Sequence, residues 1–463
     1  MGSIKGGAAL VQGSRGGIGT FGAMSASTKK FIIDGGQTLQ GEVAVRGAKN
    51  AVTKEMVAAL LTPGISHLTN VPDIGDVGIT RRILESLGCR IEHDAEQGLL
   101  SIDATHLHGP EVASEYSGLN RIPILLAGVL IHRFGRAVIP MMGGCDIGPR
   151  PIDFHLQGLR DLGARIDYRD GAYHFDAKGL QGARITLPFP SVGATENLLM
   201  AAVLAKGITE IRNAAIEPEI VDLALLLQSM GAIISQETDR TWIVQGVQSL
   251  KPVKHRVIND RIEAASFAVS AIVSRGDVFV RGADQLHLLT FLNLLRRAGG
   301  AFEIHADGIR FLGKHSDLKA IALETGVHPG FMTDWQQPFV ILLTQAAGLS
   351  VIHETVYENR FGYTQTLNRM GASIQLFSEC LGGKDCRFKH SGHQHSAVIH
   401  GPTRLKGAKV EIPDLRAGFS YLVAAVVAEG RSELSGVRYI ERGYDRVVEK
   451  FRALGAPISQ RED

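Results

Sequence analysis

An internal repeat is the strongest constraint that this sequence places on its fold. Six times along the chain, an apolar helix-like run ends at a glycine that opens a β-branched stretch. Subtracting successive glycine positions gives steps of 71, 72, 69, 72 and 82 residues. The sequence therefore predicts six copies of one structural unit. The marker glycines are Gly64, Gly135, Gly207, Gly276, Gly348 and Gly430.

A second glycine marker repeats in phase with the first. It follows the apolar end of a helix-like run and precedes a short strand-like segment. We expect the glycines of both sets to end helices, because glycine adopts the left-handed backbone without strain. The second set is Gly88, Gly163, Gly231, Gly299, Gly371 and Gly455.

The sequence pattern of each unit predicts two helices and several strands. One unit alone cannot bury its own apolar helix face. Three units grouped around shared buried helices would form one core, so six units predict two similar α/β domains with a site in the cleft between them. A chain of 463 residues, 44% of them hydrophobic, is long enough for two cores. We expect residues 1–23, which are rich in glycine and serine and precede Met24, to be a disordered leader segment.

Composition excludes several classes of partner. The net charge of +2 comes from 49 basic and 47 acidic residues, which gives no reason to expect a nucleic-acid or membrane surface. The longest apolar stretch, residues 122–131, is too short to span a bilayer. Four cysteines in so long a chain favour a reducing cytoplasm over a disulfide framework. The glycine run at 13–19 lacks the preceding strand of a dinucleotide site, so no cofactor is expected.

Cys145 is the first candidate for chemistry. It lies in a glycine-rich turn after an apolar strand-like run and five residues before Arg150. Nearby positive charge and exposed backbone N–H groups lower the pKa of a thiol, so this context predicts a reactive cysteine. The alternative, a small buried hydrophobic residue, suits Cys89 better.

Basic side chains in loop-like positions form a second group of candidates. Planar guanidinium groups bind carboxylates and phosphates through two hydrogen bonds, so a cluster drawn from both halves would hold a small, multiply charged anion. Taken singly, each is equally compatible with a solvated surface charge. The group comprises Lys49, Arg121, Arg150, Arg360, Arg416 and Arg442.

Three further segments leave alternatives open. Asp334 precedes an apolar helix and is either a helix cap or a catalytic carboxylate. Ser191 and Val192 open another helix, whose N–H groups would hold phosphate oxygens or serve an ordinary cap. An insert after Phe377 explains the long last step of the repeat. It contains Cys380, Cys386 and three histidines, but the spacing matches no usual zinc pair, so we expect a surface loop and no metal.

In this order, these segments resemble the UDP-N-acetylglucosamine enolpyruvyl transferases of the EPSP synthase superfamily, from about Phe31 to Ile458. The resemblance implies an α/β fold of two inside-out barrel domains with six βαβαββ-type repeats, three per domain. The first domain would span 48–258, and the second 24–47 plus 259–463. The implied reaction transfers the enolpyruvyl group of phosphoenolpyruvate to the 3-hydroxyl of UDP-N-acetylglucosamine by addition and elimination, releasing phosphate. It is the first committed step of peptidoglycan synthesis.

The resemblance also implies residue roles. Cys145 would donate a proton, and Asp334 would assist deprotonation of the sugar hydroxyl. Phe189 stands where many members carry a lysine near the diphosphate. The residues implied for phosphoenolpyruvate are Lys49, Asn50, Arg150 and Arg442, with Arg416 as a further active-site arginine. Those implied for the UDP-sugar are Arg121, Arg150, Pro151, Ile152, Asp153, Phe154, Ser191, Val192, Asp334 and Val356.

Two other functions stay open at this point. One is the sister activity, a 3-phosphoshikimate 1-carboxyvinyltransferase, against which the cysteine loop and the uridine-type segment from Arg150 argue. The other is a non-catalytic paralogue that binds sugar nucleotides. The presence of Lys49, Cys145, Asp334 and Arg442 argues against it, because such a protein would be expected to lose these groups.

Overall fold

Each repeated unit begins with a buried helix. In the computed structural model, which describes residues 29–141, 152–383 and 386–462, six helices have most of their side chains buried. Most of them are apolar around their circumference, which suits a place at the centre of a domain. These helices are α1 (Lys49–Ala58), α3 (Ile122–Phe134), α5 (Val192–Ala202), α7 (Arg261–Val273), α9 (Thr333–Thr344) and α11 (Leu415–Val427).

A strand and a second helix follow each buried helix. The strands are β3 (Ile65–Thr69), β6 (Arg136–Pro140), β10 (Ile208–Arg212), β14 (Asp277–Arg281), β18 (Gly348–His353) and β22 (Arg431–Ser435). The second helices are α2 (Gly75–Ser86), α4 (Asp153–Asp161), α6 (Pro218–Ser229), α8 (Leu289–Arg297), α10 (Thr364–Arg369) and α13 (Val447–Ala453), the last preceded by the short α12 (Arg438–Glu441).

A β-hairpin closes the unit and pairs antiparallel with its strand. The hairpins are β4 (Arg90–Asp94) with β5 (Leu99–Asp103), β7 (Arg165–Arg169) with β8 (Ala172–Asp176), β11 (Ile233–Gln236) with β12 (Trp242–Gln245), β15 (Phe302–His305) with β16 (Gly308–Leu312), and β19 (Ser373–Phe377) with β20 (Ser396–Gly401). In the last unit, β23 (Ile458–Arg461) pairs instead with β1 (Lys30–Asp34), so the two ends of the chain complete one sheet.

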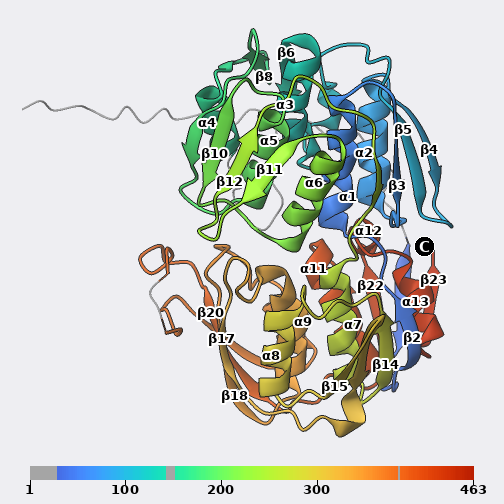
Figure 1. Cartoon of the computed structure of the whole chain (residues 1–463). Helices are drawn as coiled ribbons and strands as arrows, with labels where there is room; N and C mark the ends of the chain where they lie inside the picture. The colour runs from blue at the N-terminus through green and yellow to red at the C-terminus, as the bar shows by residue number, and fades with distance from the viewer. Residues whose placement is uncertain (1–28, 142–151, 384–385, 463) are drawn as a thin grey trace, which may run out of the picture.

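A parallel strand on the other side of the central strand completes most of the sheets. These outer strands are β2 (Gln40–Ala44), β9 (Arg184–Thr186), β13 (Lys254–Arg256), β17 (Ala322–Glu324) and β21 (Lys409–Glu411). Within the described ranges the sheets have four strands, except the three-stranded sheet β6-β8-β7. Figure 1 shows the sheets on the outside and the buried helices between them.

The chain passes between the two halves twice. After β2 in the second half it enters α1 in the first, and after β13 in the first half it enters α7 in the second. The two crossing segments lie side by side, since Ala48 donates its N–H to the carbonyl of Ile258 at 2.7 Å. Gly47 is required here, because a Cβ would lie 2.2 Å from the carbonyl oxygen of Asn70.

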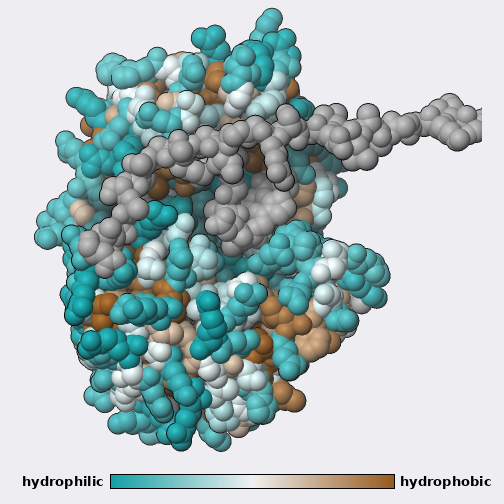
Figure 2. Space-filling view, turned by 180° about the vertical axis from the view of Figure 1, so that it is seen from behind, coloured by the Kyte–Doolittle hydropathy of each residue, from teal (hydrophilic) through white to brown (hydrophobic). Residues whose placement is uncertain are grey.

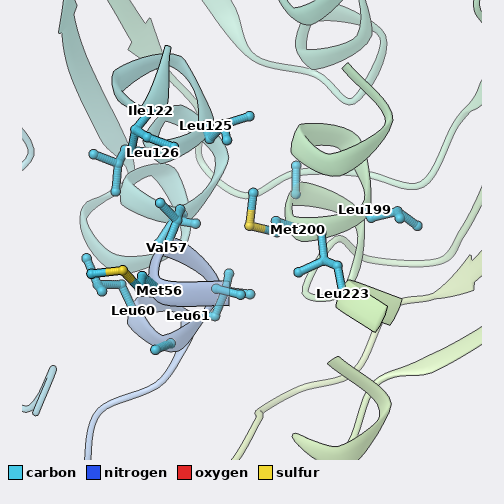
Figure 3. Close-up of a cluster of buried hydrophobic side chains, with 14 of the residues drawn as sticks. Met56, Val57, Leu60, Leu61, Ile122, Leu125, Leu126, Leu199, Met200 and Leu223 are labelled. Atoms are coloured by element: carbon cyan, nitrogen blue, oxygen red, sulfur yellow. The ribbon is translucent and has the colours of Figure 1, made fainter. Parts of the chain in front are cut away.

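Each half has its own hydrophobic core. One core draws on residues 48–257, and the other draws on residues 31–45 together with 262–458. In the first core, Met56 of α1, Leu126 of α3, Met200 of α5 and Leu223 of α6 converge between the helices (Figure 3). The predicted fold class, an α/β protein with helices inside and sheets outside, is confirmed.

The glycine prediction is confirmed for the second marker set and only in part for the first. Gly135 caps α3, but Gly64, Gly207, Gly348 and Gly430 lie beyond the cap residues, in left-handed backbone at the start of the strands. Gly88 has a φ of 104° and donates its N–H to the carbonyl of Glu85, while Cys89 donates to Leu84. These two bonds form a Schellman cap, which explains the requirement for glycine. At the fourth unit the expectation is wrong, because Arg275 takes the left-handed backbone with a φ of 54°, one residue before Gly276.

The face shown in Figure 2 is mostly hydrophilic, with separate apolar patches. Among the described residues, no helix has both the length and the apolar character needed to cross a membrane.

Candidate active site

Lys49 and Arg442, predicted from opposite halves of the chain, hold the same carboxylate. Lys49 begins α1, Asp76 lies in the first turn of α2, and Arg442 follows α12. The Nζ of Lys49 lies 2.9 Å from one carboxylate oxygen of Asp76, and the Nε of Arg442 lies 2.9 Å from the other. Arg442 also donates through Nη2 to the carbonyl of Leu119 at 3.0 Å. The two cations are therefore fixed at the boundary between the halves.

The charges in this first cluster favour the ionised form of the Asp76 carboxyl. Burial opposes ionisation of the Asp76 carboxyl, but the charges of Lys49 and Arg442 outweigh it and lower its pKa. Burial also lowers the pKa of Lys49, an effect that Asp76 opposes and that the positive charges of Lys54 and Arg416 reinforce. The side chains of Lys49 and of Leu415, the residue before Arg416, both lie against Gly443, so the segment that carries Arg416 adjoins this cluster.

Asp334 is the centre of that second cluster. It lies in the first turn of α9, where Met332 occupies the cap position, so Asp334 is not the helix cap. One carboxylate oxygen lies 2.7 Å from Nη2 of Arg360, and the other lies 3.3 Å from Nη2 of Arg416. The two arginine side chains are only 3% and 6% exposed, whereas Asp334 keeps 21% exposure. The carboxylate is thus partly exposed, while its arginines are enclosed.

Arg416 is further held by an aromatic ring. Its guanidinium carbon lies 5.4 Å from the centroid of the Tyr444 ring. Burial disfavours the charge on Arg416, but Tyr444 and Asp334 outweigh burial and raise its pKa. A permanently charged, fixed guanidinium suits recognition of an anionic group.

A third group of predicted residues lies around the start of α5. Ser191 is the helix cap, and its Oγ accepts a hydrogen bond from the N–H of Ala194 at 3.4 Å. Beside it, the buried His155 of α4 has an Nδ1 that lies 3.1 Å from Nδ2 of Asn197. Burial lowers the pKa of His155 to about 3, and the positive charge of Arg121 contributes. His155 is therefore neutral, and Arg121 supplies the positive charge of this region.

The remaining predicted residues lie at or near the starts of α4, α1 and α5 and after β18. Ile152 is the buried cap residue of α4, Asp153 is exposed at the start of that helix, and Phe154 is half-buried. Asn50 and Val192 are half-buried beside Lys49 and Ser191, and Val356 is half-buried after β18. Three further predicted site residues, Cys145, Arg150 and Pro151, lie outside the described residues.

An arginine from the insert crosses to the first half of the molecule. The guanidinium carbon of Arg387 lies 4.9 Å from the centroid of the Phe189 ring, and Arg387 also donates to the carbonyl of Val356. Its Nη2 lies 3.7 Å from a carboxylate oxygen of Glu358. A cation therefore stands against Phe189, close to the predicted nucleotide segments.

Two residues of these clusters, Asp76 and Arg387, were not predicted from the sequence. Asp76 had no recognisable motif, and only its place after the first strand of the first unit would have suggested it. Arg387 lies in an insert that we expected to be a surface loop without a role. Both were missed because their partners lie far along the chain.

Comparison of the sequence and fold with known proteins identifies the family of this chain. A model described as EPSP synthase (3-phosphoshikimate 1-carboxyvinyltransferase) matches residues 33–451. The enolpyruvyl transferase NikO from Streptomyces tendae superposes with a TM-score of 0.83 at 23% identity, covering 94% of this chain and 99% of that one. An EPSP synthase from Acinetobacter baumannii superposes with a TM-score of 0.72 at 19% identity, covering 94% and 100%. The chain belongs to the EPSP synthase family, and these structures share its fold.

Relatives that are similar in sequence identify a group within this family to which the chain is similar. The chain is 51% identical over 437 residues to the UDP-N-acetylglucosamine 1-carboxyvinyltransferase of Protochlamydia amoebophila, covering 93% of this chain and 94% of that protein. It is 40% identical to UDP-N-acetylglucosamine 1-carboxyvinyltransferase 1 of Staphylococcus epidermidis, covering 93% and 99%. Within the family, the chain groups with the UDP-N-acetylglucosamine 1-carboxyvinyltransferases, which confirms the resemblance seen in its sequence.

Proposed function

We propose that this enzyme transfers the enolpyruvyl group of phosphoenolpyruvate to the 3-hydroxyl of UDP-N-acetylglucosamine and releases phosphate. The observation that carries the proposal is a pair of adjoining charged clusters, one of which joins the two halves. The partly exposed Asp334 lies between Arg360 and Arg416, and Asp76 lies between Lys49 and Arg442. The side chains of Lys49 and of Leu415, which directly precedes Arg416, both lie against Gly443. The relatives at 40–51% identity favour this activity over the two alternatives.

The arrangement suits an addition followed by an elimination. Asp334 takes the proton of the sugar 3-hydroxyl, whose oxygen attacks C2 of phosphoenolpyruvate, while Cys145 donates a proton to C3. The resulting tetrahedral ketal loses phosphate as a proton leaves C3 and the double bond returns. Lys49, Arg442 and Arg150 hold the phosphate and carboxylate, because fixed cations stabilise negative charge that builds up on the departing group.

The nucleotide would occupy the region around α4 and α5. Ser191 and Val192 offer the N-terminal end of α5 to the diphosphate, and Arg121 adds positive charge. Residues 150–154 would bind the uridine, and Val356 the acetylated sugar. The charge missing at Phe189 is supplied by Arg387, whose guanidinium lies against that ring.

We place this reaction in the cytoplasm, as the first committed step of peptidoglycan synthesis. The cysteines that the structure describes, Cys89, Cys380 and Cys386, are all unbridged thiols, which supports a reducing compartment. Burial raises the pKa of Cys89 to about 12, in keeping with an inert core thiol and with Cys145 as the reactive one.

The decisive assay mixes the purified chain with phosphoenolpyruvate and UDP-N-acetylglucosamine and measures phosphate release. Release that depends on both substrates supports the proposal. Phosphate release from phosphoenolpyruvate with shikimate 3-phosphate, but not with UDP-N-acetylglucosamine, would identify the sister activity. No release with either acceptor would indicate a non-catalytic paralogue.

A second assay addresses Cys145. The thiol-directed epoxide fosfomycin should alkylate this residue in the presence of the sugar nucleotide, and peptide mass spectrometry would locate the adduct. Recovery of an unmodified Cys145 peptide after prolonged exposure would contradict its role as the reactive thiol.

A further inference from the structure

Four potential metal ligands converge at one end of the sheet that contains β18, β19 and β20. His353 ends β18, His395 directly precedes β20, and Cys380 and Cys386 lie in the insert between β19 and β20. His353 pairs in register with Ser396, which brings the two histidines to the same end of the sheet. One ligand atom from each of the four residues lies within 4.8 Å of all the others.

The spacing of these atoms fits a tetrahedral ion. The two sulfur atoms of Cys380 and Cys386 are 3.6 Å apart, and Sγ of Cys380 lies 3.4 Å from Nε2 of His395. In a tetrahedral site with Zn–S bonds of about 2.3 Å and Zn–N bonds of about 2.0 Å, the S···S and S···N separations are about 3.8 and 3.5 Å. The two separations measured from Cys380 are therefore already close to those of a zinc site, and the remaining ligand atoms lie within 4.8 Å of one another.

His353 provides an independent indication that a ligand is bound here. Its side chain is completely buried, and neither ring nitrogen has a hydrogen-bond partner among the residues that the structure describes. The nearest carboxylate oxygen, on Glu324, lies 3.9 Å from Nδ1, too far for a hydrogen bond. Leaving a buried polar group unpaired costs about 1–3 kcal/mol, and a metal bond to the ring would remove that cost.

Hydrogen-bond partners hold two of the four side chains in orientations that suit metal ligands. Nδ1 of His395 lies 2.7 Å from the carbonyl oxygen of His393, which fixes the proton on Nδ1 and leaves the lone pair of Nε2 facing Cys380. The backbone N–H of Phe388 donates to Sγ of Cys386 at 3.3 Å, which favours a thiolate. Glu324 stands beside His353 as the outer carboxylate.

We propose that His353, Cys380, Cys386 and His395 bind one Zn²⁺ ion in a closed Cys₂His₂ site. Two thiolates and two neutral imidazoles match the ligand preference of zinc. Four protein ligands fill a tetrahedral site, so no position is left open for catalysis. Binding releases two thiol protons to solvent, so the ion and its ligands are neutral together, which suits a site with two buried histidines.

This proposal replaces the expectation of a metal-free surface loop. The spacing in the insert alone gave no zinc pattern, because one ligand, His353, comes from the end of a different strand. The site would fasten the insert to the sheet. Arg387 directly follows Cys386, so zinc would also fix the arginine that reaches Phe189 in the first half.

The primary test measures the zinc content of the full-length protein by inductively coupled plasma mass spectrometry after purification without chelators. We expect about one zinc per chain in the wild type and less than about one-tenth in the Cys380→Ser/Cys386→Ser variant. His390→Ala is the matched control, because this exposed histidine lies in the same insert but outside the cluster, and it should keep the full zinc content.

A second measurement does not depend on variants that fold. Wild-type protein stripped of zinc and loaded with Co²⁺ should show the visible absorption of tetrahedral cobalt with thiolate charge-transfer bands. Wild-type protein that retains no zinc after incubation with excess Zn²⁺ and desalting would overturn the proposal. So would full zinc content in the double serine variant, or a Cys380–Cys386 disulfide in protein isolated under reducing conditions.

Discussion

Replacing Asp334 with asparagine separates the two tasks that the structure assigns to its carboxylate. The substitution keeps the shape of the side chain but removes its charge and its ability to take a proton. Asp334 is the shared counter-charge of Arg360 and Arg416, at 2.7 and 3.3 Å, and it is also the proposed acceptor of the hydroxyl proton. Stability and activity should both fall, for different reasons.

The size of each effect follows from the geometry. Breaking a buried ion pair by removing one partner costs about 3–5 kcal/mol, but Asp334 is 21% exposed and the amide oxygen still accepts one bond. We therefore expect a loss of about 1–3 kcal/mol in the free energy of unfolding. Loss of a general base lowers the rate about 10²- to 10⁴-fold. The activity loss should thus far exceed any effect of partial unfolding at the assay temperature.

The assay compares phosphate release and melting temperature for three proteins beside the wild type. Asp334→Asn should lose both activity and stability. Adding Arg360→Met removes one uncompensated buried charge, so it should recover part of the melting temperature but none of the activity. Asp34→Asn, which breaks an exposed pair with Arg431 on a distant sheet, should leave activity unchanged. A kcat/KM for Asp334→Asn within threefold of wild type would refute its role as the proton acceptor.

Three further predictions concern other groups. Asp76→Asn removes the anchor of two cations, so kcat/KM for phosphoenolpyruvate should fall about 10- to 100-fold in initial-rate measurements, and an unchanged value would contradict a positioning role. Burial raises the pKa of Glu263 to about 7, so the folded state keeps a proton that the unfolded state loses above its ordinary pKa. The free energy of unfolding should then fall as pH rises from about 4.5 to 7, and Glu263→Gln should make the melting temperature less dependent on pH across that window. An equal pH dependence in wild type and variant would show that Glu263 is ionised throughout the window. Arg387→Ala should raise KM for UDP-N-acetylglucosamine about tenfold, and Phe189→Lys in the same background should restore it; equal KM values in all three proteins would exclude the exchange.

The repeat predicted the fold because it records a backbone requirement. A glycine that ends a helix in left-handed backbone, as Gly88 does, leaves a mark in the sequence at every copy of the unit. The limit of this signal is visible at the fourth unit, where Arg275 takes the left-handed conformation before Gly276. Gly276 is required for a different reason, because a Cβ there would lie 2.2 Å from the carbonyl oxygen of Leu39. Patterns of single residues therefore predict the units better than they predict each cap.

The site was predicted only where a residue type is unusual in its local context. An arginine or aspartate next to a helix start, such as Arg416 or Asp334, is visible as a candidate along the sequence. The partners that give these residues their geometry are not visible, because they come from other units. Asp76 meets Arg442 across more than 300 positions, and His353 meets Cys380 only because two strands end together.

The two chain crossings lie beside this site, and any relative movement of the halves would turn about them. Lys49 is the first residue of α1 directly after one crossing, and its backbone N–H donates to a carboxylate oxygen of Asp260 at the other crossing, at 3.2 Å. Asp260 in turn caps α7 through the N–H groups of Ile262 and Glu263. A rotation of one half against the other must turn about these paired segments, so it would change the direction of Lys49 relative to Arg442. We therefore expect closure around an anion to align the two cations in the same motion. Removing the capping carboxylate with Asp260→Ala should weaken both phosphate release and the change in the scattering curve on addition of ligand, and an unchanged scattering response would contradict this coupling.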